Sequence, residues 1–162
     1  MKQAIILLGS NMGNRFRLLE DARGHIEAKA GPVVRQSAIY ETEPWGFEAE
    51  QNFLNQVLIV DTQKDAWELM AQLLEIEKKL GREPVAPDGG YASRIIDIDI
   101  LFYADRVINR DQLKVPHPEL HKRLFTMKPL QEVAPDLVHP VLKKTVTQLL
   151  HDCPDNAKVR RL

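Results

Sequence analysis

The stretch that decides the fold runs from residue 95 to residue 103 and reads Ile95-Ile96-Asp97-Ile98-Asp99-Ile100-Leu101-Phe102-Tyr103. Apolar and acidic residues alternate through its first half, and a period of two is typical of a β-strand that buries one face. The pattern predicts that the isoleucines at 96, 98 and 100 point into the core. Asp97 and Asp99 then share the opposite face. Residues 104–105 would turn this strand into a short partner strand over residues 106–108.

Outward from this strand, the remaining patterns alternate between strands and helices. Apolar and alternating runs predict strands over residues 4–8, 33–41 and 53–61. Helical periodicity predicts helices over about 15–30 and 65–80, with the apolar faces Leu18, Leu19, Ala22, Ile26 and Met70, Leu73, Leu74, Leu80. This order of elements is that of a ferredoxin-like split βαβ sandwich. We therefore predict an α+β fold in which both long helices cover one face of an antiparallel sheet.

The C-terminal part of the chain adds elements to this pattern. Prolines recur through it, at Pro116, Pro118, Pro129, Pro135 and Pro140. They predict short helices, the last of them over residues 145–152, where Thr145 and Gln148 have the spacing of a capping box. These extra C-terminal helices would pack on the opposite face of the sheet.

Length and composition bound the function. A chain of 162 residues suits one compact domain, so we expect residues 1–162 to form a single domain. The net charge of −1 provides no basic field for nucleic acid, and the apolar run near the start is too short to span a membrane. Cys153 is the only cysteine, which excludes an internal disulfide and fits a reducing compartment. We expect a cytoplasmic protein whose partners are small molecules.

The two aspartates of the decisive strand are candidate metal ligands. Residues two apart on a strand lie about 6–7 Å from each other on the same face. Two ionised carboxylates at that spacing repel each other unless a cation lies between them. Mg²⁺ prefers oxygen ligands and is usually held by one or two carboxylates together with phosphate oxygens. The alternative is a sheet with one solvated face, on which Asp97 and Asp99 are merely polar.

Arginine and aromatic residues supply further candidates. Arg82 and Arg94 bracket residues 82–93, a stretch rich in proline and glycine that could act as a lid or as an ordinary connection. The planar guanidinium matches phosphate oxygens, although most surface arginines are only solvated. Trp45, Phe53 and Phe125 could hold a flat heterocycle, and the Asn55 amide could bind its edge. Such aromatic residues more often serve packing, so both interpretations stay open.

Motifs along nearly the whole chain resemble those of the 6-hydroxymethyl-7,8-dihydropterin pyrophosphokinase family of folate biosynthesis. The matching segments are Leu8-Gly9-Ser10-Asn11, Tyr40-Glu41-Thr42 with Pro44, Phe53-Leu54-Asn55, Leu80-Gly81-Arg82, Ala92-Ser93-Arg94-Ile95-Ile96-Asp97-Ile98-Asp99-Ile100-Leu101, Val115-Pro116-His117, Arg123, Phe125 and Pro129-Leu130. The Arg-x-x-Asp-x-Asp block is the most specific of them.

The resemblance implies an enzyme that transfers pyrophosphate from ATP to the hydroxymethyl group of the pterin and releases AMP. It implies that Asp97 and Asp99 hold two Mg²⁺ ions and that Arg82 and Arg94 act with them in catalysis. The implied ATP contacts are Glu77, Arg82, Arg94, Ile100, His117 and Arg123. The implied pterin contacts are Thr42, Glu43, Trp45, Phe53, Asn55 and Phe125. We expect a monomer that binds ATP and 6-hydroxymethyl-7,8-dihydropterin, and neither nucleic acid nor membrane.

Two rival functions remain at this stage. A different ATP-dependent kinase could use the same metal site and would release ADP instead of AMP. A non-enzymatic ferredoxin-like module could bind a small ligand or a partner, and it would show no Mg-dependent binding of ATP. The nucleotide product and the magnesium dependence of binding therefore separate the three interpretations.

Overall fold

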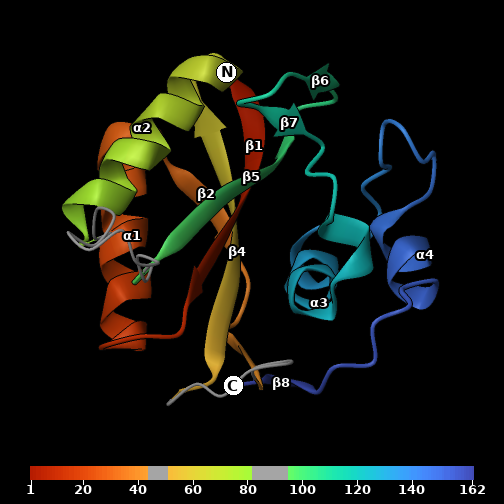
Figure 1. Cartoon of the computed structure of the whole chain (residues 1–162). Coiled ribbons are helices and arrows are strands. Elements are labelled where there is room, and N and C mark those ends of the chain that lie inside the picture. Colours follow the sequence, from red (N-terminus) through yellow and green to blue (C-terminus); the bar gives the residue numbers. More distant parts are fainter. Residues whose placement is uncertain (44–50, 82–94) are drawn as a thin grey trace.

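A computed structural model describes residues 1–43, 51–81 and 95–162, and its main feature is an antiparallel sheet with helices on both faces (Figure 1). The sheet contains β1 (Lys2–Ser10), β2 (Val33–Gln36), β3 (Tyr40–Thr42), β4 (Phe53–Thr62), β5 (Asp97–Tyr103) and β8 (Val159–Arg161). Its order is β5-β1-β4-β3-β8, and β2 also pairs with β4. The helices are α1 (Arg15–Lys29), α2 (Ala66–Lys79), α3 (Leu124–Val133), α4 (Val146–His151) and the 3₁₀ turn Leu120–Lys122.

The core forms one layer on each face of this sheet, as the alternation of residues in the strands predicts. On one face, Ile96, Ile98 and Ile100 pack with the buried residues of α1 and α2. On the other face, alternate residues of β1 and β4 pack against Met127 of α3 and Leu149 of α4. Figure 1 shows α1 and α2 on one side of the sheet and α3 and α4 on the other. The α+β sandwich and the position of the extra C-terminal helices are therefore confirmed.

Side-chain caps fix where the helices begin. Asp65 and Glu68 form a capping box at the start of α2, and Thr145 and Gln148 form the predicted one at the start of α4. Thr62, three residues before Asp65, donates its hydroxyl to the carbonyl oxygen of Ala30 at 2.7 Å. Each cap satisfies backbone N–H groups that the first turn of a helix leaves without partners.

The predicted strand over residues 33–41 is two strands, β2 and β3, and Ser37 explains the break. Gln36 pairs with Leu58 and Tyr40 pairs with Asn55, so residues 37–39 face only residues 56–57 of β4. This extra residue makes a β-bulge. The Ser37 hydroxyl accepts the backbone N–H of Val57 at 3.0 Å and replaces a carbonyl oxygen in the ladder.

Three further expectations about secondary structure are corrected. The short strand β6 (Ile108–Asn109) pairs with β7 (Lys114–Val115) and not with the decisive strand, as we had predicted for residues 106–108. Leu74 is 40 % exposed and does not belong to the buried face of α2. The predicted Leu73 does belong to it, together with Leu69 and Ile76, which were not predicted. The edge strand β8 had no counterpart in the prediction, and it pairs with β3.

Among the described helices, none combines the length and the apolar content that crossing a bilayer requires.

The buried side chain of His139 makes the free energy of unfolding depend on pH. Its Nδ1 accepts the backbone N–H groups of Val141 at 3.2 Å and Leu142 at 3.0 Å. Burial, followed by the charge of His121, lowers the pKa of His139 below its ordinary value. A histidine with a lower pKa in the folded state takes up its proton on unfolding, so the free energy of unfolding falls as the pH drops below about 6.5.

We expect the thermal unfolding midpoint to be constant from about pH 7 to 8 and to fall between about pH 6.5 and 5. His139→Asn should reduce the steepness of this fall, because it removes one of the groups that become protonated on unfolding. Calorimetric scans across the range measure both curves. Equal pH dependence in the variant and the wild type would contradict the assignment to His139.

Candidate active site

Strands β3, β4 and β5 bring their predicted site residues to one end of the sheet, where β1 also ends. β1 and β3 end there at Ser10 and Thr42, and β4 and β5 begin there at Phe53 and Asp97. The register places Asn55 opposite Gly9 of β1, and Gly9 opposite Asp97 of β5. Because neighbouring strands lie about 4.8 Å apart, the backbones of Asn55 and Asp97 are roughly 10 Å apart across Gly9. Residues that are distant in the sequence thus form one surface.

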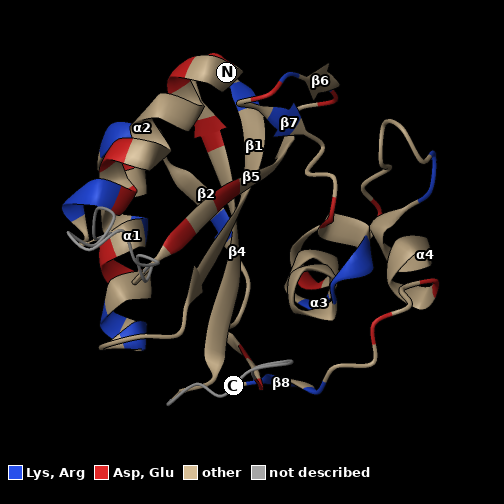
Figure 2. Cartoon of the chain, viewed as in Figure 1, with Lys and Arg blue, Asp and Glu red and all other residues tan. Residues whose placement is uncertain are grey.

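Asp97 and Asp99 lie on the face of the sheet opposite the isoleucines, as predicted. They are paired with Gly9 and Leu7 of β1, and both are half-buried. Figure 2 shows acidic residues along β5, the edge strand of the sheet. The Ser10 hydroxyl donates to the carbonyl oxygen of Ile95 at 2.6 Å. This bond joins the end of β1 to the residues that precede β5, and it fixes the backbone from which the two carboxylates project.

Both carboxylates line a cavity of about 410 Å³. Its other walls come from α2, from the segment that contains β7 and from the residues that follow it. The predicted nucleotide contacts that it brings together with Asp97 and Asp99 are Glu77, Ile100 and His117. Asp111 and Lys114 also line the cavity, and neither was predicted from the sequence. Nothing in the pattern around them indicated a site, although Lys114 directly precedes the Val115-Pro116-His117 motif.

His117 is a neutral hydrogen-bond donor in this cavity. Its Nδ1 accepts the backbone N–H of Glu119 at 3.1 Å, which assigns the proton of the neutral ring to Nε2. Burial, followed by the positive charge of Arg123, lowers the pKa of His117, while Glu119 and Asp97 act in the opposite direction. The ring is therefore uncharged at pH 7, and its Nε2–H can donate to an anionic oxygen.

The charges of the cavity decide which ligands fit it. Its described lining contains four carboxylates, from Glu77, Asp97, Asp99 and Asp111, but only one cation of a lysine or arginine, from Lys114. Carboxylate oxygens are the ligands that Mg²⁺ prefers, and magnesium commonly joins carboxylates to phosphate oxygens. The donor set of Asp97 and Asp99 therefore fits magnesium.

Next to this cavity, Asn55 carries a polar atom without a partner. The side chain is 4 % exposed, and its Nδ2 donates to the carbonyl oxygen of Leu8 at 3.2 Å. Its Oδ1 is buried and finds no hydrogen-bond partner in the described parts of the chain. A Cβ atom at Gly9 would lie 2.8 Å from Nδ2, so glycine at this position makes room for the amide. Buried polar atoms normally have partners, and an exception calls for a ligand or another explanation.

Thr42 repeats this feature on the neighbouring strand. It is paired with Phe53, it is 6 % exposed, and its Oγ1 also has no partner among the described residues. The two atoms without partners lie on adjacent strands at the same end of the sheet. Together they form a polar edge that a heterocycle with donors and acceptors could complete.

The remaining candidates are placed as follows. Phe125 lies on α3 and packs against the core layer of that face, and the guanidinium carbon of Arg123 is 5.7 Å from the centre of its ring. Neither residue lines the cavity of the two aspartates. Glu43 is exposed and follows Thr42 directly. Trp45, Arg82 and Arg94 lie outside the described residues.

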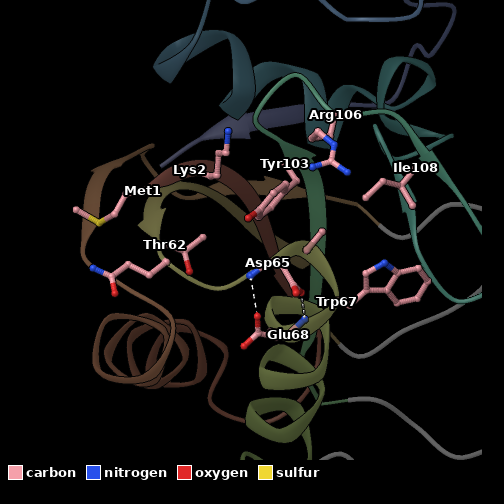
Figure 3. A pocket seen from close by; sticks show the side chains of 11 residues that line it. Met1, Lys2, Thr62, Asp65, Trp67, Glu68, Tyr103, Arg106 and Ile108 are labelled. Atoms are coloured by element: carbon pink, nitrogen blue, oxygen red, sulfur yellow. Dashed lines mark hydrogen bonds between the residues drawn. The ribbon is translucent and has the colours of Figure 1, made fainter.

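A larger hollow of about 670 Å³ lies at the other end of the strands, beside Thr62 and Tyr103 (Figure 3). None of the predicted site residues lines it. Figure 3 shows Asp65 and Glu68 joined by the hydrogen bonds of the α2 capping box, so these polar groups are already engaged with each other. The chemistry indicated by the sequence therefore lies in the smaller cavity.

Comparison with known proteins adds a finding that is independent of this geometry. Residues 5–135 match the family described as 7,8-dihydro-6-hydroxymethylpterin-pyrophosphokinase. The chain belongs to this family. A relative from Aquifex aeolicus, named 2-amino-4-hydroxy-6-hydroxymethyldihydropteridine pyrophosphokinase, is 40 % identical over 141 residues, which cover 87 % of this chain and 86 % of the relative. The resemblance seen in the motifs is thus confirmed.

Other relatives are much longer than this chain. The folic acid synthesis protein fol1 of Pneumocystis carinii is 38 % identical over 151 residues, which cover 93 % of this chain but only 20 % of that protein. A structure of wild-type Plasmodium falciparum HPPK-DHPS superimposes on this chain with a TM-score of 0.72 at 17 % identity. The superposition covers 93 % of this chain and 44 % of the Plasmodium chain. At that identity the superposition shows the fold alone. This chain therefore spans less than half of these larger proteins.

Proposed function

We propose that this protein transfers the pyrophosphoryl group of ATP to the hydroxymethyl group of 6-hydroxymethyl-7,8-dihydropterin and releases AMP, a step of folate biosynthesis. The observation that carries the proposal is the row Asp97, Gly9 and Asn55 across three strands. It sets a carboxylate cavity suited to a metal–nucleotide complex beside a buried polar edge suited to a heterocycle. Family membership supports the same activity.

In the proposed reaction, the hydroxymethyl oxygen attacks the β-phosphorus of ATP. A new oxygen–phosphorus bond forms there, the bond from the β-phosphorus to the oxygen that bridges to the α-phosphorus breaks, and AMP leaves with that oxygen. The proton of the hydroxyl passes to water or to a carboxylate of the site. Positioning and charge stabilisation dominate such chemistry, so the protein mainly has to align the two substrates.

The roles proposed for single residues follow from where they lie. Asp97 and Asp99 would hold two Mg²⁺ ions, which when bound neutralise phosphate charge and acidify the attacking hydroxyl. Glu77 and Ile100 would lie along the nucleotide, and His117 would donate to its phosphates together with Arg82, Arg94 and Arg123. The proposed pterin contacts are Thr42, Glu43, Trp45, Phe53, Asn55 and Phe125, with the two phenylalanines on the faces of the ring.

The decisive experiment is incubation of the protein with Mg–ATP and 6-hydroxymethyl-7,8-dihydropterin, followed by analysis of both products. We expect AMP and pterin diphosphate in equal amounts, and no product when a chelator removes the magnesium. ADP with a pterin monophosphate would instead identify a kinase of the ordinary type. Absence of both turnover and Mg-dependent ATP binding would favour a non-enzymatic module.

We further propose that residues 1–162 work as one pyrophosphokinase domain, as a monomer in the cytoplasm. The match over residues 5–135 supports the domain, and the single cysteine, Cys153, fits a reducing compartment. Light scattering of the purified protein would test the monomer, because a dimer would double the measured mass.

A further inference from the structure

One carboxylate that lies outside the proposed site, that of Glu132, connects α3 with β3, the two elements that carry the proposed pterin contacts Phe125 and Thr42. Glu132 lies on α3, and its Oε1 accepts the hydroxyl of Tyr40 at 2.6 Å. Its Oε2 accepts the backbone N–H of Ala38 at 2.9 Å. Arg161 of β8 donates its Nε–H to Oε1 at 3.3 Å. One side chain thus connects the helix with the short strand β3 and with the edge strand β8.

We propose that Glu132 is a positioning residue that sets the distance between β3 and α3 and so shapes the pterin pocket. This inference rests on the proposed function, because it assigns to the pocket the residues that these two elements carry. Glu132 itself touches neither substrate. It would act through Thr42 on β3 and through Phe125 on α3.

The spacing along each element supports this role. Tyr40 and Thr42 are two residues apart on β3, so both side chains face α3 from the same side of the strand. Glu132 and Phe125 are seven residues apart on α3, which is two helical turns, so they lie on one face about 10 Å from each other. The bond from Tyr40 to Glu132 therefore holds the two surfaces that carry Thr42 and Phe125 together.

β3 needs such a restraint because it is short and ends at Thr42, a proposed pterin contact. It contains three residues, from Tyr40 to Thr42, and it follows the bulge at Ser37. A strand of this length has few ladder hydrogen bonds of its own. Glu41 adds a second restraint on the other face, where Arg160 of β8 donates to its Oε1 at 2.6 Å and Arg15 lies 3.6 Å from its Oε2.

The ionisation of the cluster agrees with a bond made at neutral pH. Burial, then the hydrogen bond to Glu132, raises the pKa of Tyr40 to about 12, so the phenol keeps the proton that it donates. Burial alone would raise the pKa of Glu132, but the bonds from Tyr40, Ala38 and Arg161 outweigh it and lower that pKa. At pH 7 the carboxylate is charged and can accept all three donors.

The test compares three variants with the wild type in steady-state kinetics for each substrate. Glu132→Ala removes all three contacts, and we expect it to raise the KM for the pterin roughly tenfold while the KM for ATP changes less than about twofold. Glu132→Gln keeps an acceptor for Tyr40 but replaces the oxygen that accepts from Ala38 with a donor, so it should recover part of the loss. Asp152→Ala is the control, because it breaks only the exposed pair with Lys144 at 3.0 Å. All assays are run well below the unfolding temperature of the least stable variant.

Amide hydrogen exchange of residues 38–42 provides a readout that needs no substrate. We expect faster exchange there in Glu132→Ala than in the wild type. Unchanged exchange, an equal rise in both KM values, or a Glu132→Gln variant as poor as Glu132→Ala would each overturn the proposal. A wild-type protein that forms no AMP would overturn the proposed function and with it the pterin role of Glu132, and the exchange would still decide whether the carboxylate holds β3.

Discussion

Replacing Asp97 with asparagine is expected to lower the rate of AMP formation roughly a thousandfold, because a metal ion contributes several kcal/mol to such a reaction and each 1.4 kcal/mol changes the rate about tenfold. Asparagine keeps the size of the side chain and one oxygen, but it loses the charge that binds a divalent cation. Asp97 lines the cavity beside Asp99, and its backbone is fixed by the register with Gly9. The fold should therefore survive the change.

Single-turnover formation of AMP at saturating Mg–ATP measures the effect, and circular dichroism with thermal unfolding checks the fold. Asp61→Asn is the matched control, since Asp61 is also an aspartate on a strand of this sheet but lies at the far end of β4 and lines neither hollow. We expect the control to turn over at the wild-type rate. Turnover within a few-fold of wild type by a folded Asp97→Asn protein would contradict a metal role for this residue.

Much of the fold could be predicted because its signals are local. The alternation in residues 95–103 depends only on which neighbours are apolar, and the buried isoleucines and the shared face of Asp97 and Asp99 follow from it. The capping box of α4 is equally local, because Thr145 and Gln148 are three residues apart. The order of the long elements then limits the topology, since sequential elements with short connections leave few alternatives.

The parts that could not be predicted depend on contacts between distant residues. The bulge that divides residues 33–41 exists because Ser37 bonds to Val57 of another strand. Strand β8 forms only because β3 presents a free edge to it, and residues 159–161 contain no strong strand pattern. The prediction for Leu74 failed for the same reason. Its position in the helical period places it at the border of the apolar face, and only the packing of α2 on β5 decides which leucines at that border are covered.

For the candidate site, the sequence indicated the kind of chemistry but not the arrangement. The resemblance named residues scattered between positions 42 and 125, and no spacing shows that Asn55, Gly9 and Asp97 form one row. The buried oxygen of Asn55 without a partner is likewise visible only once its surroundings are known. Asn55 and its neighbour Gln56 are both buried amides on β4. The Gln56 amide has partners at both ends, whereas the Asn55 oxygen has none among the described residues, so substituting each residue in turn tests the role of Asn55.

Asn55→Leu is expected to lower kcat/KM for the pterin roughly a hundredfold and to leave the free energy of unfolding unchanged or slightly higher. The buried Oδ1 costs stability while it lacks a partner, and an apolar side chain of similar size removes that cost, which offsets the loss of the 3.2 Å bond from Nδ2 to the carbonyl oxygen of Leu8. The same change deprives the pterin of a donor and an acceptor, and substrates are discriminated strongly where a site is built to hydrogen-bond them. Steady-state kinetics and denaturant unfolding measure the two effects, and the KM for ATP should not change.

Gln56→Leu should show the opposite pattern and is the matched control. Gln56 is also a buried amide, but it accepts from Arg23 at 2.7 Å and donates to the carbonyl oxygen of Ser37 at 2.7 Å. Its loss leaves both partners unsatisfied, so we expect the protein to be destabilised by about 2 kcal/mol with kcat/KM for the pterin unchanged. If Asn55→Leu destabilised the protein as much as Gln56→Leu does, Asn55 would be a structural amide, and the polar edge would not be a pterin site.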